Sequence, residues 1–113
     1  RDFVHVDDLV ELIDYQVHNI EKFVGKVYNA GGGIENSASL QEMTAICEKI
    51  TGNKIIIDEV EETRTADLRI YITDNTKIED EIGWKPQKSV ETIFKDIYFW
   101  IQKNEKQLES ILK

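Results

Sequence analysis

The chain has 113 residues, 41% of them hydrophobic and 32% charged, and its 22 acidic and 14 basic side chains give a formal net charge of −8. These values are typical of one globular domain and exclude a disordered chain, and the acidic balance argues against nucleic acid as a partner. A single cysteine excludes an internal disulfide framework and a cysteine-rich zinc site, and neither a membrane span nor a signal peptide is indicated.

The first thirty residues predict a strand, a helix and a second strand. Residues 3–6 are β-prone, and either Asp7 or Asp8 can cap the helix that follows. Apolar side chains recur every three or four residues at Val10, Ile13, Val17 and Ile20. This spacing predicts a helix over about residues 7–22. Residues 26–30 predict a buried strand that ends at a run of three glycines.

The middle of the chain predicts a second helix and a third strand. Ser39 and Glu42 have the spacing of a capping box, so a helix should begin there and end with Gly52 as a left-handed cap. Residues 54–60 contain three consecutive isoleucines, which favour a strand. The acidic stretch that follows predicts a loop, and residues 68–72 predict a short extended segment.

Two further helices are expected in the last third of the chain. Asp74 can cap a short helix that ends at Ile82 before Gly83, and Ser89 can cap a long amphipathic helix. The order of elements is then β, α, β, α, β, loop, α, α, which is an α/β pattern. Because it has too few strands for a doubly wound sheet and begins at Arg1 instead of methionine, we expect a fragment of a longer protein.

No motif predicts a catalytic residue, a cofactor-binding loop or a metal site. The glycines at 31–33 lack the G-x-G-x-x-G spacing and do not lead directly into a helix, which favours a flexible turn over a dinucleotide loop. Neither His5 nor His18 has a partner at helical metal-site spacing. Cys47 falls on the apolar face of its helix and is expected in the core. The acidic run at 58–62 lacks the glycine of a calcium loop and predicts a solvated face.

Arg64 and Asp67, with Arg69 nearby, form a group with ligand-binding chemistry. The planar guanidinium fork of arginine suits phosphate oxygens, and a carboxylate can accept hydrogen bonds from two ribose hydroxyls. Together they could hold the diphosphate and sugar of a nucleotide. Surface Arg–Asp pairs without any ligand are also common, so the pattern alone leaves both interpretations open.

Four segments of the sequence occur in an order that is typical of one protein family. They are residues 1–10 (RDFVHVDDLV), 27–33 (VYNAGGG), 64–67 (RTAD), and 74–77 with 82–86 (DNTK and IGWKP). The set closely resembles extended short-chain dehydrogenases/reductases, the NAD-dependent epimerases and dehydratases of nucleotide sugars. Many members have Pro-Gly in place of Thr65 and Ala66, a difference that alters loop stiffness.

The resemblance implies an α/β fold of the extended Rossmann type. Residues 1–113 would form a single C-terminal fragment, mainly the substrate-binding subdomain, with residues 1–33 adding a helix and a strand to the Rossmann sheet. NAD and the catalytic Tyr-x-x-x-Lys pair would belong to an N-terminal part that is not in this sequence. The resemblance also implies that Arg1, Arg64 and Asp67 bind a nucleotide-diphosphate sugar.

Residues 32–40 and 67–71 are most similar to the CDP-sugar 2-epimerases, which interconvert CDP-paratose and CDP-tyvelose by oxidation and re-reduction at C2. The alternatives are a 4,6-dehydratase or 4-epimerase of the same family, or a freestanding α/β module that binds a protein partner. The family implies a cytoplasmic homo-oligomer without a membrane or nucleic-acid partner. We expect the 113-residue chain by itself to self-associate, especially through an exposed strand edge at residues 3–6.

Overall fold

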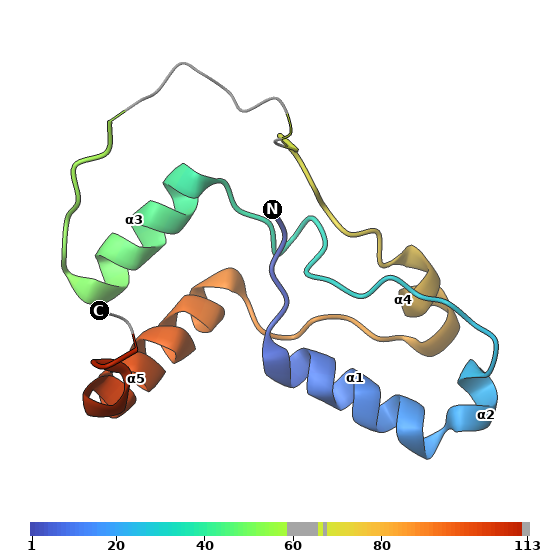
Figure 1. Cartoon of the computed structure of the whole chain (residues 1–113). Helices are drawn as coiled ribbons and strands as arrows, with labels where there is room; N and C mark the ends of the chain where they lie inside the picture. The colour runs from blue at the N-terminus through green and yellow to red at the C-terminus, as the bar shows by residue number, and fades with distance from the viewer. Residues whose placement is uncertain (59–65, 67, 112–113) are drawn as a thin grey trace.

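The computed structural model describes residues 1–58, 66 and 68–111 of the chain, and these residues form five helices. The helices are α1 (Val6–His18), α2 (Ile20–Phe23), α3 (Leu40–Thr51), α4 (Thr76–Ile82) and α5 (Val90–Leu108). The helices α3 and α5 lie against each other, and α1, α2 and α4 occupy the other end of an elongated molecule (Figure 1).

Local capping signals account for three helix boundaries, two in α3 and one in α5. The Ser39 hydroxyl accepts a hydrogen bond from the backbone N–H of Glu42, and the Glu42 carboxylate accepts one from the backbone N–H of Ser39, so the predicted capping box is confirmed. The hydroxyl of Ser89 caps α5 in the same way, through the backbone N–H of Thr92. Gly52 ends α3 in the left-handed conformation, as expected.

The first helix departs from the prediction in its start and in its length. It begins at Val6, and its cap is His5, whose Nδ1 atom accepts the backbone N–H of Asp7 at 3.0 Å. The predicted caps, Asp7 and Asp8, instead lie in the first turn. Carboxylates at this position stabilise a helix by interacting with the positive end of its dipole. The helical run breaks at Asn19, and α2 follows as one short turn.

The α/β prediction is not confirmed, because the described residues form no sheet. Their only β pairing is one isolated antiparallel bridge between Asp2 and Ser37. The predicted strands at 3–6, 26–30 and 68–72 are not formed, and residues 54–58 of the third predicted strand are also without strand structure. A strand needs a neighbouring strand to pair its backbone groups, and β-propensity alone cannot supply one.

Residues 26–28 are held in place by side-chain contacts instead of the backbone hydrogen bonds of a strand. Lys26 and the Tyr28 hydroxyl both contact the carboxylate of Glu81 on α4, at 2.8 and 2.6 Å. The ammonium group of Lys77 donates a hydrogen bond to the backbone carbonyl of Val27 at 2.8 Å. This segment therefore lies alongside α4 and is fixed by three side-chain contacts.

The hydrophobic core is small for a chain of this length. Its buried apolar side chains are Leu12, Phe23, Ala38, Ile78, Val90 and Ile93. The radius of gyration is 17.5 Å, whereas a compact domain of this length has a value of about 13 Å. The accessible surface is 9361 Å², and a compact monomer of this mass exposes about 6,400 Å². The chain thus leaves much apolar surface uncovered.

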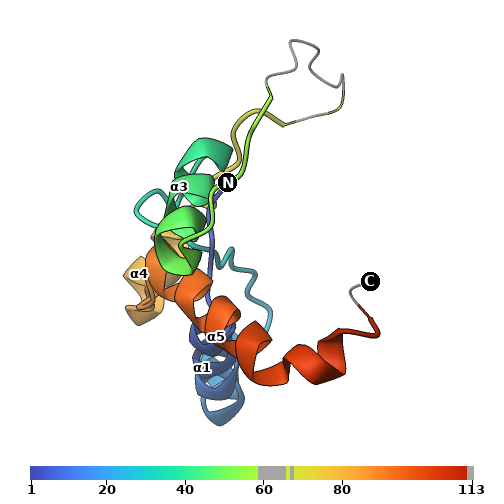
Figure 2. The ribbon, with the colours of Figure 1, turned by 90° about the vertical axis from the view of Figure 1, so that its left-hand side faces the viewer.

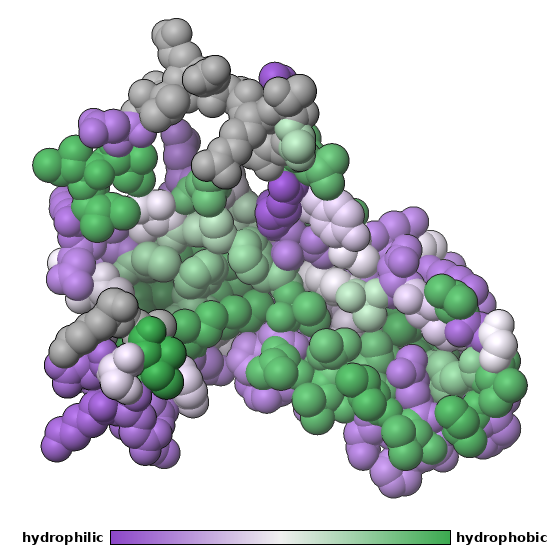
Figure 3. All heavy atoms as spheres, viewed as in Figure 1, coloured by the Kyte–Doolittle hydropathy of each residue, from purple (hydrophilic) through white to green (hydrophobic). Residues whose placement is uncertain are grey.

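The exposed large hydrophobic side chains are divided between the helices and the segments that connect them. Hydrophobic side chains gather along α1 and in the hollow between α3 and α5 (Figure 3). A second view shows the C-terminal half of α5 projecting away from α1 (Figure 2). Beside the start of α1, five apolar residues line an open groove of about 570 Å³: Val6, Ile97, Trp100, Ile101 and Leu108. We call it the α5 groove.

A cluster of charged side chains fixes the start of α1 to the segment before α5. The buried carboxylate of Asp8 accepts the backbone N–H of Lys88 at 3.1 Å. The ammonium group of Lys88 forms an ion pair with Asp7 and lies 3.6 Å from the carboxylate of Asp96. The Nε2 atom of His5 lies 3.3 Å from the same Asp96 carboxylate. These contacts orient residues 1–5 relative to α5.

Candidate functional site

Two arginines from distant parts of the sequence line one cleft beside the beginning of α3. Its volume is about 500 Å³, and its lining includes Arg1, Ser39, Gln41, Met43, Leu68 and Arg69. Its chemistry combines two cationic side chains with hydroxyl, amide and apolar groups. We call it the arginine cleft.

Backbone pairing places Arg1 in this cleft. The carbonyl of Arg1 accepts the backbone N–H of Ala38 at 2.9 Å, and its terminal amino group donates to the carbonyl of Ala38 at 3.2 Å. The N–H of Phe3 donates to the carbonyl of Asn36 at 2.8 Å. Residues 1–3 therefore run antiparallel to residues 36–38, which hold Arg1 next to the start of α3.

The positive end of α3 is already occupied by a carboxylate of the chain itself. Glu42 accepts hydrogen bonds from both the N–H and the hydroxyl of Ser39, at 2.8 and 2.7 Å. The hydrogen bonds from the backbone N–H and the hydroxyl of Ser39 lower the pKa of Glu42 below its usual range. An anion in the arginine cleft would therefore rely on the guanidinium groups instead of the helix terminus.

The structure shows the position of only one of the three ligand-binding residues expected from the sequence. Arg1 lies in the cleft, whereas Arg64 and Asp67 lie outside the described residues. Leu68 and Arg69, which directly follow Asp67 in the sequence, do line the cleft. The sequence marked Arg69 only as a neighbour of the pair, and the backbone pairing of residues 1–3 was the non-local information that it lacked.

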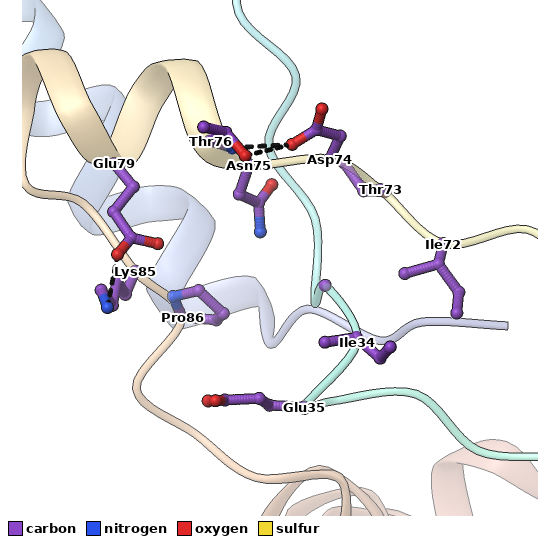
Figure 4. Close-up of a pocket in the computed structure, with 11 residues that line it drawn as sticks. Ile34, Glu35, Ile72, Thr73, Asp74, Asn75, Thr76, Glu79, Lys85 and Pro86 are labelled. Carbon is purple, nitrogen blue, oxygen red and sulfur yellow. Dashed lines mark hydrogen bonds and ion pairs between the residues drawn. The ribbon is translucent and has the colours of Figure 1, made fainter.

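A second, more polar pocket lies on the other side of the glycine run. Its volume is about 360 Å³, and Figure 4 shows residues 34–35 facing residues 72–76 across it. Asp74 accepts hydrogen bonds from the backbone N–H and the hydroxyl of Thr76 at 2.9 and 2.6 Å, and Glu79 forms an ion pair with Lys85. Because these charged groups already have partners, we assign the pocket a structural role.

The glycine run itself forms a tightly packed junction. Asn75 and Gly31 exchange two hydrogen bonds, of 3.0 and 2.8 Å, and the carboxylate of Asp2 accepts the backbone N–H of Gly33 at 3.1 Å. A Cβ atom added to Gly32 would lie 2.1 Å from the carbonyl oxygen of Phe3, so only glycine fits there. We call residues 2–3, 31–33, 73 and 75 the glycine junction.

This packing decides between the two interpretations of the glycines. The backbone of Phe3 occupies the space beside Gly32, and Thr73 occupies the space beside Gly31. A dinucleotide-binding loop needs its glycines free so that a pyrophosphate can approach the backbone. The run therefore does not fit NAD, and its role differs from the flexible turn that the sequence favoured, because the junction is closely packed.

No group of three or more His, Cys, Asp or Glu side chains in the described part of the chain could hold a metal ion. No described helix combines the length and the apolar composition needed to cross a membrane.

The comparison with known families identifies the class of protein. The family of GDP-mannose 4,6 dehydratase matches residues 1–97 of this chain, which is most of its length. The chain belongs to this family. The resemblance to nucleotide-sugar epimerases and dehydratases expected from the sequence is thereby confirmed.

Individual relatives are nucleotide-sugar epimerases. The chain is 30% identical over 100 residues to CDP-paratose 2-epimerase of Salmonella typhi. The matched stretch covers 88% of this chain and 29% of that relative. It is 31% identical over 106 residues to UDP-glucose 4-epimerase 2 of Arabidopsis thaliana, and 32% identical over 108 residues to UDP-glucose 4-epimerase 1 of Oryza sativa subsp. japonica. These matches cover 92% of this chain and 29% and 30% of the two relatives. The chain thus spans less than a third of their length.

Proposed function

We propose that this chain is the nucleotide-sugar-binding, C-terminal part of an NAD-dependent epimerase. The observation that carries the proposal is the arginine cleft, where Arg1 and Arg69 face one cavity in a chain whose overall charge is −8. Two cations gathered on an acidic protein favour a localised anion, and the diphosphate of a nucleotide sugar provides one. Arg64 and Asp67 complete the proposed site as contacts to the diphosphate and the ribose.

The proposed role of the site is to convert remote binding energy into orientation. A nucleotide held by its diphosphate and ribose places the attached sugar in a fixed position, so that the reacting carbon meets the catalytic groups. When bound, NAD would supply the hydride chemistry. We propose that the part of the enzyme outside this sequence holds it, because the glycine run here does not fit it.

For the substrate, we propose CDP-paratose and its conversion to CDP-tyvelose by oxidation and re-reduction at C2. The similarity to CDP-paratose 2-epimerase supports this choice. The similarity to UDP-glucose 4-epimerases is of the same strength, so a 4-epimerase or a dehydratase acting on another nucleotide sugar is the alternative. Comparing the affinities of CDP and UDP for the chain shows whether the site prefers a cytidine or a uridine nucleotide.

Titration of CDP into the chain and its Arg64 variants tests the proposed site. A charge-assisted hydrogen bond contributes about 1.5–3 kcal/mol, so Arg64→Ala should weaken CDP binding by about 10- to 150-fold. Arg64→Lys should recover part of the affinity, because it keeps the charge and loses the fork. Calorimetry, or NMR if binding is weak, provides the affinities. Equal CDP affinity in the native chain and Arg64→Ala would contradict the assignment of Arg64.

A further inference from the structure

We propose that Arg69 is a direct contact to the diphosphate and that it binds the same anion as Arg1. The inference rests on the proposed function and adds to it a residue that the pair Arg64 and Asp67 does not include. Its starting point is position: Arg1 and Arg69 are far apart in the sequence, and both line the arginine cleft.

Among the described residues, Arg69 differs from five lysines in having no acidic partner. Acidic partners neutralise the ammonium groups of Lys26, Lys49, Lys85, Lys88 and Lys95. Among the described residues Arg69 has no such ion pair and no side-chain hydrogen bond, although the chain carries a large excess of carboxylates. An exposed guanidinium without an acidic partner keeps its donors available for a ligand.

The cationic side chains of the cleft favour an anionic ligand over a neutral one. The N–H and hydroxyl of Ser39 are engaged by Glu42, so an anion in the cleft would rely on a guanidinium group such as that of Arg69. A guanidinium fork can bind two oxygens of one phosphate, and two forks from separate segments can bind the two phosphates of a diphosphate. A volume of about 500 Å³ is of the size that accommodates a small nucleotide.

The test compares three probes, namely CDP, CMP and cytidine, on the native chain and on Arg69→Ala, Arg69→Lys and Lys103→Ala. We expect Arg69→Ala to weaken CDP binding by about 10-fold or more, CMP binding by less, and cytidine binding not at all. Arg69→Lys should recover part of the loss. Lys103 is an exposed cation on α5 outside the arginine cleft, so Lys103→Ala removes the same charge and should leave CDP affinity unchanged.

The outcomes separate this inference from the proposed function. If Arg69→Ala binds CDP as tightly as the native chain while Arg64→Ala does not, the inference is wrong and the nucleotide site stands. If the native chain binds CDP no better than cytidine, both are wrong. An equal loss of CDP affinity in Arg69→Ala and Lys103→Ala would also overturn the inference, because it would show a general charge effect. The circular dichroism spectrum of each variant confirms that its helices are retained.

Discussion

The glycine junction and the α5 groove are built from the same chain in opposite ways. At the junction three segments meet, and backbone groups, side-chain amides and a carboxylate are paired with one another. Along the α5 groove, Ile97 is 49% exposed and Trp100 is 57% exposed, so about half of each side chain is left uncovered.

The difference teaches which interactions this stretch of chain provides for itself. Its polar contacts are complete, since each described buried side-chain nitrogen or oxygen has a hydrogen-bond partner. Its apolar contacts are incomplete, because the accessible surface exceeds that of a compact monomer of the same mass by roughly 3,000 Å². The proposed ligand-binding cleft lies next to residues 36–38, whose backbone groups are hydrogen-bonded to residues 1–3.

The largest effect should come from filling the junction. In Gly32→Ala the new Cβ would lie 2.1 Å from the carbonyl oxygen of Phe3, and backbone atoms cannot move aside cheaply. We expect the free energy of unfolding to fall by about 2–3 kcal/mol, measured by urea denaturation. Gly25→Ala is the matched control: nothing lies near its added Cβ, and only its positive φ of 75° opposes the change. It should cost about 1 kcal/mol. Equal losses would show that the junction is not closely packed.

The second prediction concerns the α5 groove. The sequence placed self-association at the edge of residues 3–6, but Phe3 already donates its N–H to Asn36, and no strand forms there. We therefore expect copies of the chain to associate through the groove, and Trp100→Glu to weaken that association by about 10-fold or more. Sedimentation equilibrium measures it. Lys103→Glu, elsewhere on α5, should have a much smaller effect. A monomeric native chain at high concentration would contradict the prediction.

A smaller effect is expected when Asp2 is protonated. Burial raises the pKa of its carboxyl, but hydrogen bonds from Thr73 and Gly33 outweigh burial and hold this pKa below its usual range. The stabilisation is therefore present at neutral pH and is lost in acid, as the pH falls below the usual range of an aspartate and through the lowered folded-state pKa. Asp2→Asn should lower the free energy of unfolding at pH 7 by about 1 kcal/mol and flatten its acid dependence. An unchanged acid slope in Asp2→Asn would refute this assignment.

The smallest expected signal is enzymatic. The chain alone should not convert CDP-paratose to CDP-tyvelose when NAD is added, because the glycine junction leaves no room for a dinucleotide beside Gly32. Chromatography of the nucleotide sugars after long incubation measures the conversion. Turnover by the pure chain would contradict both the structural role of the junction and the proposed division of labour.

The sequence predicted several features that depend on near neighbours and failed for those that depend on distant ones. The capping residues Ser39 and Ser89 act within one helical turn, so their spacing was sufficient. The His5 cap was missed because aspartates, the usual capping residues, follow it directly. The strands were wrong because pairing needs a partner segment, which β-propensity does not specify.

The candidate site shows the same division between local and distant information. Arg1 was expected from the resemblance, and the structure places it in a cleft with Arg69. That meeting depends on the bridge between Asp2 and Ser37 and on the contact between Gly32 and Phe3. Both join residues about thirty positions apart, and no short motif encodes them. The roles of Arg64 and Asp67 stay predictions from the sequence.

The most direct test of the central claim is a map of where CDP binds. Amide chemical shifts of the isotope-labelled chain, recorded with CDP and with cytidine, report which segments respond. We predict CDP-specific changes at residues 38–43 and 68–69, which border the arginine cleft, and little change at residues 72–76 in the polar pocket. Changes confined to residues 72–86, or the same changes with cytidine as with CDP, would contradict it.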